Sequence, residues 1–404
     1  LDVAVSRGLK QLDFNRQWRK NFTAVNLLLA LFIAVGPNLQ AEPVQFRPST
    51  NLYARSAPLD LGDYAIPCAA DWNGDGRRDL LVGYRYADKV AVFLNVGTDA
   101  QPVLTNSFNL QAGGVDIFVA GASCGAPAPW VCDYDRDGKR DLLVGRGSDG
   151  TVYFFANTNT DASPRLAPGV QLTAGGATLS IGIRATPFVH DWDEDGLPDL
   201  LCGTGGGSAF WYRNTSATGL PVLAAPVQVQ AGGAALSLNI RAVVRVFDWD
   251  GDGLKDLVGS SSTGVYWCRN SGDNATPMLG LPRPIQAPTD SGLTAINASG
   301  RMRLDLADWN DDGVVDLLLG NMDGSVQLFE GYRFEFTSLA PTSPAGMTLQ
   351  WRSSPYLKYH VLAAAAPEAT FSIVASNLSS AGSLTVWTNA RSVGREFYRV
   401  QIAP

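Results

Sequence analysis

The chain of 404 residues is too long for one small domain. At about 150 residues per domain, its length predicts two or three domains or one large repeat architecture. Hydrophobic residues make up 46% and charged residues 17%, which excludes a disordered chain. The net charge of −7, from 31 basic and 38 acidic residues, comes without any basic stripe, so we expect no nucleic-acid partner. The 42 glycines and 23 prolines favour turns and strands over helices, and we predict an all-β fold.

The first 41 residues have the features of a signal peptide. Five basic residues precede an apolar stretch over 24–36, and the small residue Ala41 follows it. Because these 13 residues fall short of the roughly 20 that a spanning helix needs, a signal peptide is favoured over an anchor or a buried core helix. We predict a signal peptide over 1–41, a mature chain without a membrane span, and a secreted or cell-surface location. Without residues 1–41 the chain has 26 basic and 36 acidic residues, a net charge of −10.

The five cysteines show no C-x-x-C pair and no zinc-site spacing, which argues against a thiolate-bound metal. Cys68, Cys132, Cys202 and Cys268 fall in or beside predicted strands, where we expect them to be small buried side chains. Cys124 stands in a loop of Gly, Ala and Pro. We expect Cys124 to be the exposed thiol.

One acidic pattern occurs five times, and its copies include DYDRDGKRDLLVG and DWDEDGLPDLLCG. The copies begin at Asp71, Asp133, Asp191, Asp248 and Asp308, at intervals of 62, 58, 57 and 60 residues. Ala-Gly-Gly recurs at 112, 174 and 231 with matching intervals. The sequence therefore contains five repeats of about sixty residues.

Each repeat has the strand pattern of a β-propeller blade. The acidic stretch lies between two apolar segments, and a third β-rich run follows at 90–95, 151–156, 208–212, 264–268 or 325–329. A Pro-containing segment such as 221–230 supplies a fourth strand, and four antiparallel strands per unit are typical of a blade. Residues 44–52 resemble a fourth strand and would complete the last blade. We predict a five-bladed propeller closed by this N-terminal strand, since closure removes exposed sheet edges.

Each acidic stretch places oxygen side chains at positions 1, 3, 5 and 9, with Gly at position 6. This is a calcium-loop arrangement, because Ca²⁺ takes six to eight oxygen ligands and a tight turn directs alternate side chains to one centre. Position 7 varies, as expected if it provides its backbone carbonyl. The predicted ligands are Asp71, Asn73, Asp75, Arg77 and Asp79; Asp133, Asp135, Asp137, Lys139 and Asp141; Asp191, Asp193, Asp195, Leu197 and Asp199; Asp248, Asp250, Asp252, Leu254 and Asp256; Asp308, Asn310, Asp312, Val314 and Asp316.

The 18 carboxylates of these loops would repel one another without a cation. The alternative is an Asx-rich surface turn in which the Asp side chains accept only backbone N–H groups. Five recurrences of the full pattern favour calcium, and Mg²⁺ is disfavoured because it keeps several waters. About five Ca²⁺ ions, one per repeat, would bring the predicted mature charge of −10 to about zero.

The D-x-[DN]-x-D-G-x-x-D-L-L-V-G unit resembles the FG-GAP or VCBS repeat of secreted bacterial β-propellers, which are related to the calcium-binding blades of integrin α chains. The resemblance covers residues 44–331. It implies that the calcium ions are structural and that the ligand binds on the opposite face. No repeat carries a clear Phe-Gly…Gly-Ala-Pro. The resemblance is therefore used to infer only the calcium loop and the blade structure.

An aromatic residue occupies position 2 of every loop, as Trp72, Tyr134, Trp192, Trp249 or Trp309. Its recurrence favours packing between blades over a sugar-stacking platform, because binding residues should differ between blades. Candidate ligand contacts therefore lie in the turns after the second strands, at 84–86 and Arg146, and in the loop over 116–129. A solvated turn is the alternative at each of these places.

The repeat ends before a second domain. We assign residues 42–335 to the propeller, 336–346 to a linker that contains PTSPAG, and 347–404 to a small β-sandwich. Five short β-like runs after residue 346 resemble an immunoglobulin- or fibronectin-type module.

The function predicted from these features is that of a secreted, monomeric binding module that recognises an extracellular glycan or protein in adhesion or recognition. His190 takes a core position and His360 has no nucleophile motif near it, so no catalytic residue is proposed. The alternatives are a calcium-dependent polysaccharide-degrading enzyme, either a lyase or a hydrolase, and an architectural spacer.

Overall fold

A computed structural model describes residues 43–117, 126–289, 292–297, 301–333, 336–342, 346–353, 357–364, 370–380, 384–389 and 397–402. The described residues form strands and turns, which confirms the all-β prediction, and they contain no helix of the length and apolarity needed to cross a membrane. The predicted signal peptide, most of the 116–129 loop and Cys124 lie outside the described residues.

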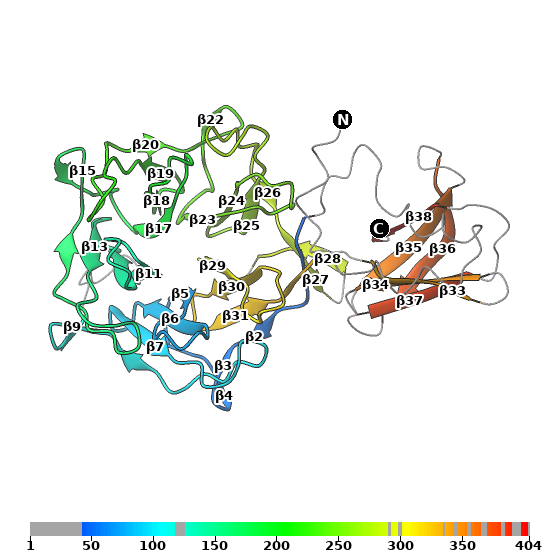
Figure 1. Cartoon of the computed structure of the whole chain (residues 1–404), viewed down its shortest axis with the longest axis horizontal. Helices are drawn as coiled ribbons and strands as arrows, with labels where there is room; N and C mark the ends of the chain where they lie inside the picture. Colours follow the sequence, from blue (N-terminus) through cyan, green and yellow to red (C-terminus); the bar gives the residue numbers. More distant parts are fainter. Residues whose placement is uncertain are drawn as a thin grey trace, which may run out of the picture.

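Five four-stranded antiparallel sheets stand around a common centre and confirm the five-bladed propeller (Figure 1). Blade 1 holds β5 (Ala65–Ala70), β6 (Asp79–Tyr84), β7 (Lys89–Phe93) and β8 (Phe108–Asn109); blade 2 holds β11 (Ala128–Cys132), β12 (Asp141–Gly145), β13 (Val152–Phe155) and β14 (Val170–Gln171); blade 3 holds β17 (Thr186–His190), β18 (Asp199–Gly203), β19 (Ala209–Tyr212) and β20 (Val227–Gln228). Blade 4 holds β23 (Val243–Phe247), β24 (Asp256–Ser260), β25 (Val265–Cys268) and β26 (Arg283–Pro284); blade 5 holds β29 (Arg303–Ala307), β30 (Asp316–Gly320), β31 (Val326–Phe329) and β2 (Thr50–Asn51).

The N-terminal segment closes the ring, as the sequence predicts. Strand β2 pairs antiparallel with β31, with Thr50 opposite Leu328, and so becomes the fourth strand of blade 5. Just upstream, β1 (Gln45–Phe46) pairs with β32 (Gly331–Tyr332). The Phe46 side chain is buried between Trp249 and Phe329. The two ends of the propeller sequence are therefore joined by backbone pairing and by core packing.

The fourth strands are shorter than the sequence predicts, since of the segment over 221–230 only β20 (Val227–Gln228) pairs as the fourth strand of blade 3. The Ala-Gly-Gly triplets instead form the turns of tight hairpins in the connections from one blade to the next. These hairpins are β9 (Gln111–Ala112) with β10 (Val115–Asp116), β15 (Thr173–Ala174) with β16 (Ala177–Thr178), and β21 (Gln230–Ala231) with β22 (Ala234–Ala235). Two further pairs complete the set: β3 (Tyr53–Ala54) with β4 (Ala57–Pro58), and β27 (Gln286–Thr289) with β28 (Gly292–Ala295).

Packing between blades explains two repeated residues. The aromatic residues at position 2 are 1% to 6% exposed and lie in clusters shared by neighbouring blades, which confirms their predicted role in the core. The Gly at position 13, as in Gly83, faces the next inner strand so closely that a Cβ would stand 1.7 Å from the Pro127 carbonyl oxygen. Blade 4 has Ser260 there, and its hydroxyl bonds to the backbone of Met302 and Leu304. This position therefore sets the contact between blades.

The C-terminal residues form two three-stranded sheets. One contains β33 (Phe336–Thr342), β34 (Gly346–Arg352) and β37 (Leu384–Asn389), and the other contains β36 (Ser372–Ser379), β35 (Lys358–Ala364) and β38 (Phe397–Ile402). A shared cluster includes Trp351 from the first sheet and Tyr359 from the second. Most of the predicted 336–346 linker is therefore strand β33, a correction to the sequence analysis. Pro341 is tolerated there because β33 is the edge strand of its sheet.

Candidate metal centre

The five acidic loops join the innermost strand of each blade to its second strand. In the first blade, for example, the loop runs from the end of β5 to the start of β6. The glycine at position 6 has a positive φ of 83° to 87° in every loop, a conformation that glycine adopts without steric cost. These glycines are Gly76, Gly138, Gly196, Gly253 and Gly313. The turn predicted for this position is therefore present in all five blades.

The carboxylate at position 9 is fully buried in each blade and holds two segments together. In blade 1, Asp79 accepts the Trp72 N–H at 3.0 Å with one oxygen and the Asn95 N–H at 2.7 Å with the other. The equivalent bonds recur at Asp141, Asp199, Asp256 and Asp316. The Oδ1 atom of each of these carboxylates accepts one of these bonds and keeps a second lone pair, so a cation could still bind to it.

Backbone N–H groups fix the other oxygen ligands within each loop. In blade 2, Asp133 accepts the Asp137 N–H at 3.1 Å and the Gly138 N–H at 3.0 Å. Asp135 accepts the Asp137 N–H at 3.2 Å, and Asp137 accepts the Lys139 N–H at 3.0 Å. The loop is therefore shaped by its own Asx turns, so its form alone does not require a cation.

Three of the loops bring their carboxylates to one point. Oxygens at positions 1, 3 and 9 lie within 4.8 Å of one another in Asp133, Asp135 and Asp141; in Asp191, Asp193 and Asp199; and in Asp248, Asp250 and Asp256. In the third and fourth loops the Oδ1 atom of position 1, in Asp191 and in Asp248, is buried without a hydrogen-bond partner. An unpartnered buried carboxylate oxygen is costly, and a hard cation such as Ca²⁺ would satisfy it. The residues present therefore fit such an ion.

Burial disfavours the charged form of the position 9 carboxylates. Desolvation raises the pKa of Asp79, Asp141 and Asp256 to about 6, although backbone hydrogen bonds act in the opposite direction. The same cause raises the pKa of Asp316 to about 7 and also raises that of Asp199. A bound divalent cation would favour the ionised form of these groups.

The position 5 carboxylates are held by basic side chains, a feature that the sequence analysis missed. Asp75 pairs with Arg77, and Asp137 pairs with Lys139 at 2.5 Å. In blade 3, Arg213 bridges Asp193 at 2.7 Å and Asp195 at 2.9 Å.

Arg269 makes the same bridge in blade 4, to Asp250 at 2.7 Å and to Asp252 at 2.9 Å. The pattern is visible in the sequence once the fold is known. Position 7 is basic in loops 1 and 2. In loops 3 and 4, where position 7 is Leu, an arginine directly follows the third strand instead. Among the described residues, no Lys or Arg forms an ion pair with the fifth loop, where Val314 and Glu330 take these two places. Basic side chains therefore offset part of the charge in four of the five loops.

The predicted ligand contacts away from the loops have different outcomes. Tyr86 is 82% exposed, Tyr84 donates to Asn109 at 3.1 Å, and Arg146 pairs with Asp149 at 3.0 Å. Arg85 lines a pocket on the propeller axis. His190 ends β17, where its ring stacks on that of a neighbouring aromatic residue and burial lowers its pKa.

The buried cysteines also lie where the sequence places them. Cys68, Cys202 and Cys268 are buried and Cys132 is half-buried, and all four are free thiols. Burial raises the pKa of Cys202 and of Cys268 to about 12. At such pKa values these thiols are not nucleophiles at neutral pH.

Comparison with known proteins identifies the repeat. Residues 191–258 and 248–319, which take in most of blades 3 and 4 and the acidic loop of blade 5, match the model of the FG-GAP-like repeat. These residues carry FG-GAP-like repeats. The chain is also 30% identical over 155 residues to integrin alpha-4 of Xenopus laevis. That match takes in 35% of this chain and 14% of the integrin, so the chain spans a small part of that relative's length.

The chain also has distant likenesses among solved structures. An Agrocybe aegerita lectin that recognises non-reducing terminal N-acetylglucosamine is 16% identical, with 82% of this chain and 86% of the lectin covered and a TM-score of 0.33. The Photorhabdus luminescens Tc holotoxin pore is 16% identical, with 80% of this chain and 15% of that chain covered and a TM-score of 0.33. Likeness at this level supports no conclusion about function.

Proposed function

We propose that this chain is an extracellular, calcium-stabilised FG-GAP-like propeller that acts as a binding module for a glycan or a protein. The observation that carries the proposal is the recurrence of one acidic loop in all five blades, with unpartnered buried oxygens on Asp191 and Asp248. Similarity to integrin alpha-4 supports an extracellular setting. In this proposal the calcium ions are structural.

The loops would hold Ca²⁺ through the side chains at positions 1, 3, 5 and 9 and the carbonyl at position 7. When bound, the ion supplies charge neutralisation that lets the acidic hairpins approach one another. The residues themselves fix the geometry: position 9 holds the strands, and positions 1 and 3 accept the N–H groups of the turn. The glycan or protein ligand then binds to other parts of the propeller. The C-terminal sheets are assigned in this proposal to an appended immunoglobulin- or fibronectin-type module.

The test is a calcium titration of the full chain, followed by a glycan array with and without calcium. About five ions per chain, together with calcium-dependent retention on a defined glycan, would support the proposal. A parallel assay would follow the ultraviolet absorbance of unsaturated products from acidic polysaccharides. Product formation with a silent array would favour the enzyme alternative, and the absence of calcium binding would overturn the metal assignment.

A further inference from the structure

Five equivalent residues meet on the propeller axis, on the face opposite the acidic loops. Each stands seven residues before the first Asp of its loop, one or two residues before the innermost strand begins. They are Tyr64, Ala126, Arg184, Arg241 and Arg301. Because equivalent positions of a closed propeller surround its axis, three arginines that are 57 and 60 residues apart in the chain converge there.

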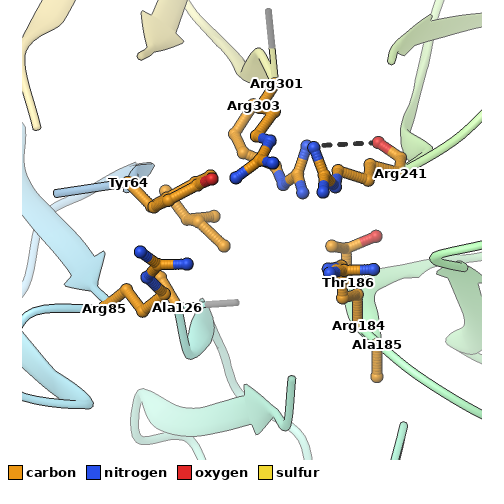
Figure 2. A pocket seen from close by; sticks show the side chains of 10 residues that line it. Tyr64, Arg85, Ala126, Arg184, Ala185, Thr186, Arg241, Arg301 and Arg303 are labelled. Atoms are coloured by element: carbon orange, nitrogen blue, oxygen red, sulfur yellow. Dashed lines mark hydrogen bonds between the residues drawn. The ribbon is translucent and has the colours of Figure 1, made fainter. Parts of the chain in front are cut away.

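These residues line one pocket, with Arg85 and Arg303 added to the ring (Figure 2). The enclosed part of the pocket is narrow, about 10 Å³, and the space between the side chains is about 390 Å³ only when open solvent is included. Figure 2 shows the guanidinium groups arriving from separate blades around this space. The pocket is therefore small, open to solvent and strongly basic.

The positive charge of the pocket is largely uncompensated. Arg85 pairs with Asp63 at 2.6 Å, but within the described part of the chain no carboxylate forms an ion pair with Arg184, Arg241, Arg301 or Arg303. The Tyr64 ring separates two of the cations, with Arg85 4.2 Å and Arg301 4.9 Å from its centroid.

Arg303 is the most deeply placed of these side chains. It is 4% exposed, and its Nη1 donates to the carbonyl oxygens of Met302 at 2.9 Å and Arg241 at 3.2 Å. Burial, followed by the charges of the neighbouring arginines, lowers the pKa of Arg303 to about 9. Since an arginine still holds its proton at neutral pH, this side chain remains a buried cation without an anionic partner.

The layer beneath the pocket supplies no spare negative charge. Asp305 is buried there, but its carboxylate is used by Arg245 at 2.7 Å and by the Ala69 N–H at 2.8 Å. The backbone of the pocket is also strained, because Tyr64, Arg184, Arg241 and Arg301 all have positive φ, between 43° and 69°. Strained backbone that holds unpaired charges is typical of a binding site.

We infer that the axial arginine pocket binds an oxyanion: a carboxylate, sulfate or phosphate group, free or at the end of a larger ligand. Guanidinium groups match these oxyanions with paired N–H donors, and several converging groups would satisfy one anion together. This site is separate from the acidic loops and does not depend on calcium. If the chain binds a glycan as proposed, the pocket selects one that carries an acidic group.

The test is isothermal titration of the full chain with inorganic sulfate at constant ionic strength. We expect saturable binding of one sulfate per chain. Arg184→Gln and Arg301→Gln should each weaken it about tenfold or more, since each removes a charge-assisted partner. Arg283→Gln is the matched control, because Arg283 is an exposed arginine on β26, the outermost strand of blade 4, and should leave the affinity unchanged.

Two further arms define the ligand chemistry. Glucuronate should bind and neutral glucose should not. Absence of saturable sulfate and glucuronate binding, equal binding by the two pocket variants and wild type, or equal binding of glucose would each overturn the inference. A calcium titration of the same samples separates the two proposals. If the chain binds calcium but not sulfate, only the inference about this pocket fails. If it binds sulfate but not calcium, only the proposed metal sites fail.

Discussion

Arg245 of β23 and Asp305 of β29 form a buried ion pair on the propeller axis, with 2.7 Å between Nε and Oδ1 and side-chain exposures of 3% and 1%. The guanidinium group also lies 4.8 Å from the Trp130 ring centroid and 5.3 Å from that of Phe188. The second oxygen of Asp305 accepts the Ala69 N–H. These five residues come from the innermost strands of all five blades, so the pair joins the whole ring.

Arg245→Met should destabilise the protein by about 3 to 5 kcal/mol, because it leaves the Asp305 carboxylate buried without its counter-charge. Arg245→Met with Asp305→Leu should be less destabilising than Arg245→Met alone, with a residual cost of about 1 to 3 kcal/mol from the unpaired Ala69 N–H. Urea unfolding measures both changes. Arg146→Met, which breaks a partly exposed pair, is the control and should cost under about 1 kcal/mol. Equal costs for Arg245→Met and Arg146→Met would contradict this account.

Asp193→Ala with Asp195→Ala should reduce the number of bound calcium ions by one and destabilise blade 3 in the presence of calcium. The reason is that the loop then loses two of its four carboxylate ligands, and ligand binding to the folded state contributes to stability. Calorimetric titration and thermal unfolding with and without calcium measure the two effects.

The control for this variant is Asp60→Ala with Asp323→Ala. It removes the same formal charge from exposed positions outside the acidic loops. The control should keep the wild-type number of ions. An unchanged number of ions in the variant of Asp193 and Asp195 would show that these residues are not ligands.

Arg213→Gln should tighten calcium binding at the third loop by up to about fivefold, because Arg213 competes with the ion for Asp193 and Asp195. The expected effect is modest, since the Arg213 side chain is 50% exposed and solvent screens the pair. In metal-free protein the same variant should melt slightly lower, because the two carboxylates then repel each other. Calcium titration and melting curves measure these opposite effects, and weaker calcium binding by Arg213→Gln would contradict the competition.

The metal-free protein should become more stable as the pH falls from about 7.5 to about 5. Burial raises the pKa of Asp79, Asp141 and Asp256 to about 6 and that of Asp316 to about 7. Over this range the folded state binds more protons than the unfolded state, so protonation favours folding, and that contribution is lost as the pH rises through the folded pKa values. Urea midpoints of metal-stripped protein measure the trend.

Two comparisons test the cause of this pH dependence. Asp316→Asn should flatten the upper part of the profile, near pH 7, because it removes the group with the highest of these pKa values. Calcium-saturated protein should show the opposite trend, since protons then compete with the ion for the same carboxylates. A metal-free protein whose stability falls steadily below pH 7 would show that these carboxylates are not destabilised by burial.

The propeller architecture could be predicted from the sequence because its signals are local. The five loops, the flanking apolar segments and the 57- to 62-residue intervals are each contained within one repeat. The closing strand β2 could be predicted because the last repeat lacks a fourth strand and the segment before the first repeat supplies one. Strand β33 was missed because its Pro341 is typical of a linker, and only the pairing with β34 shows that it is an edge strand.

Repetition along the chain by itself predicted the blades and the acidic loops, since residues close in sequence form nearly all of each. The tertiary structure alone decided which residues meet across the ring: Arg245 with Asp305, and the arginines of the axial pocket. The physical reason is that ring closure brings together residues from different blades. The buried ion pair and the unpaired arginines of the pocket therefore arise only when the ring has formed.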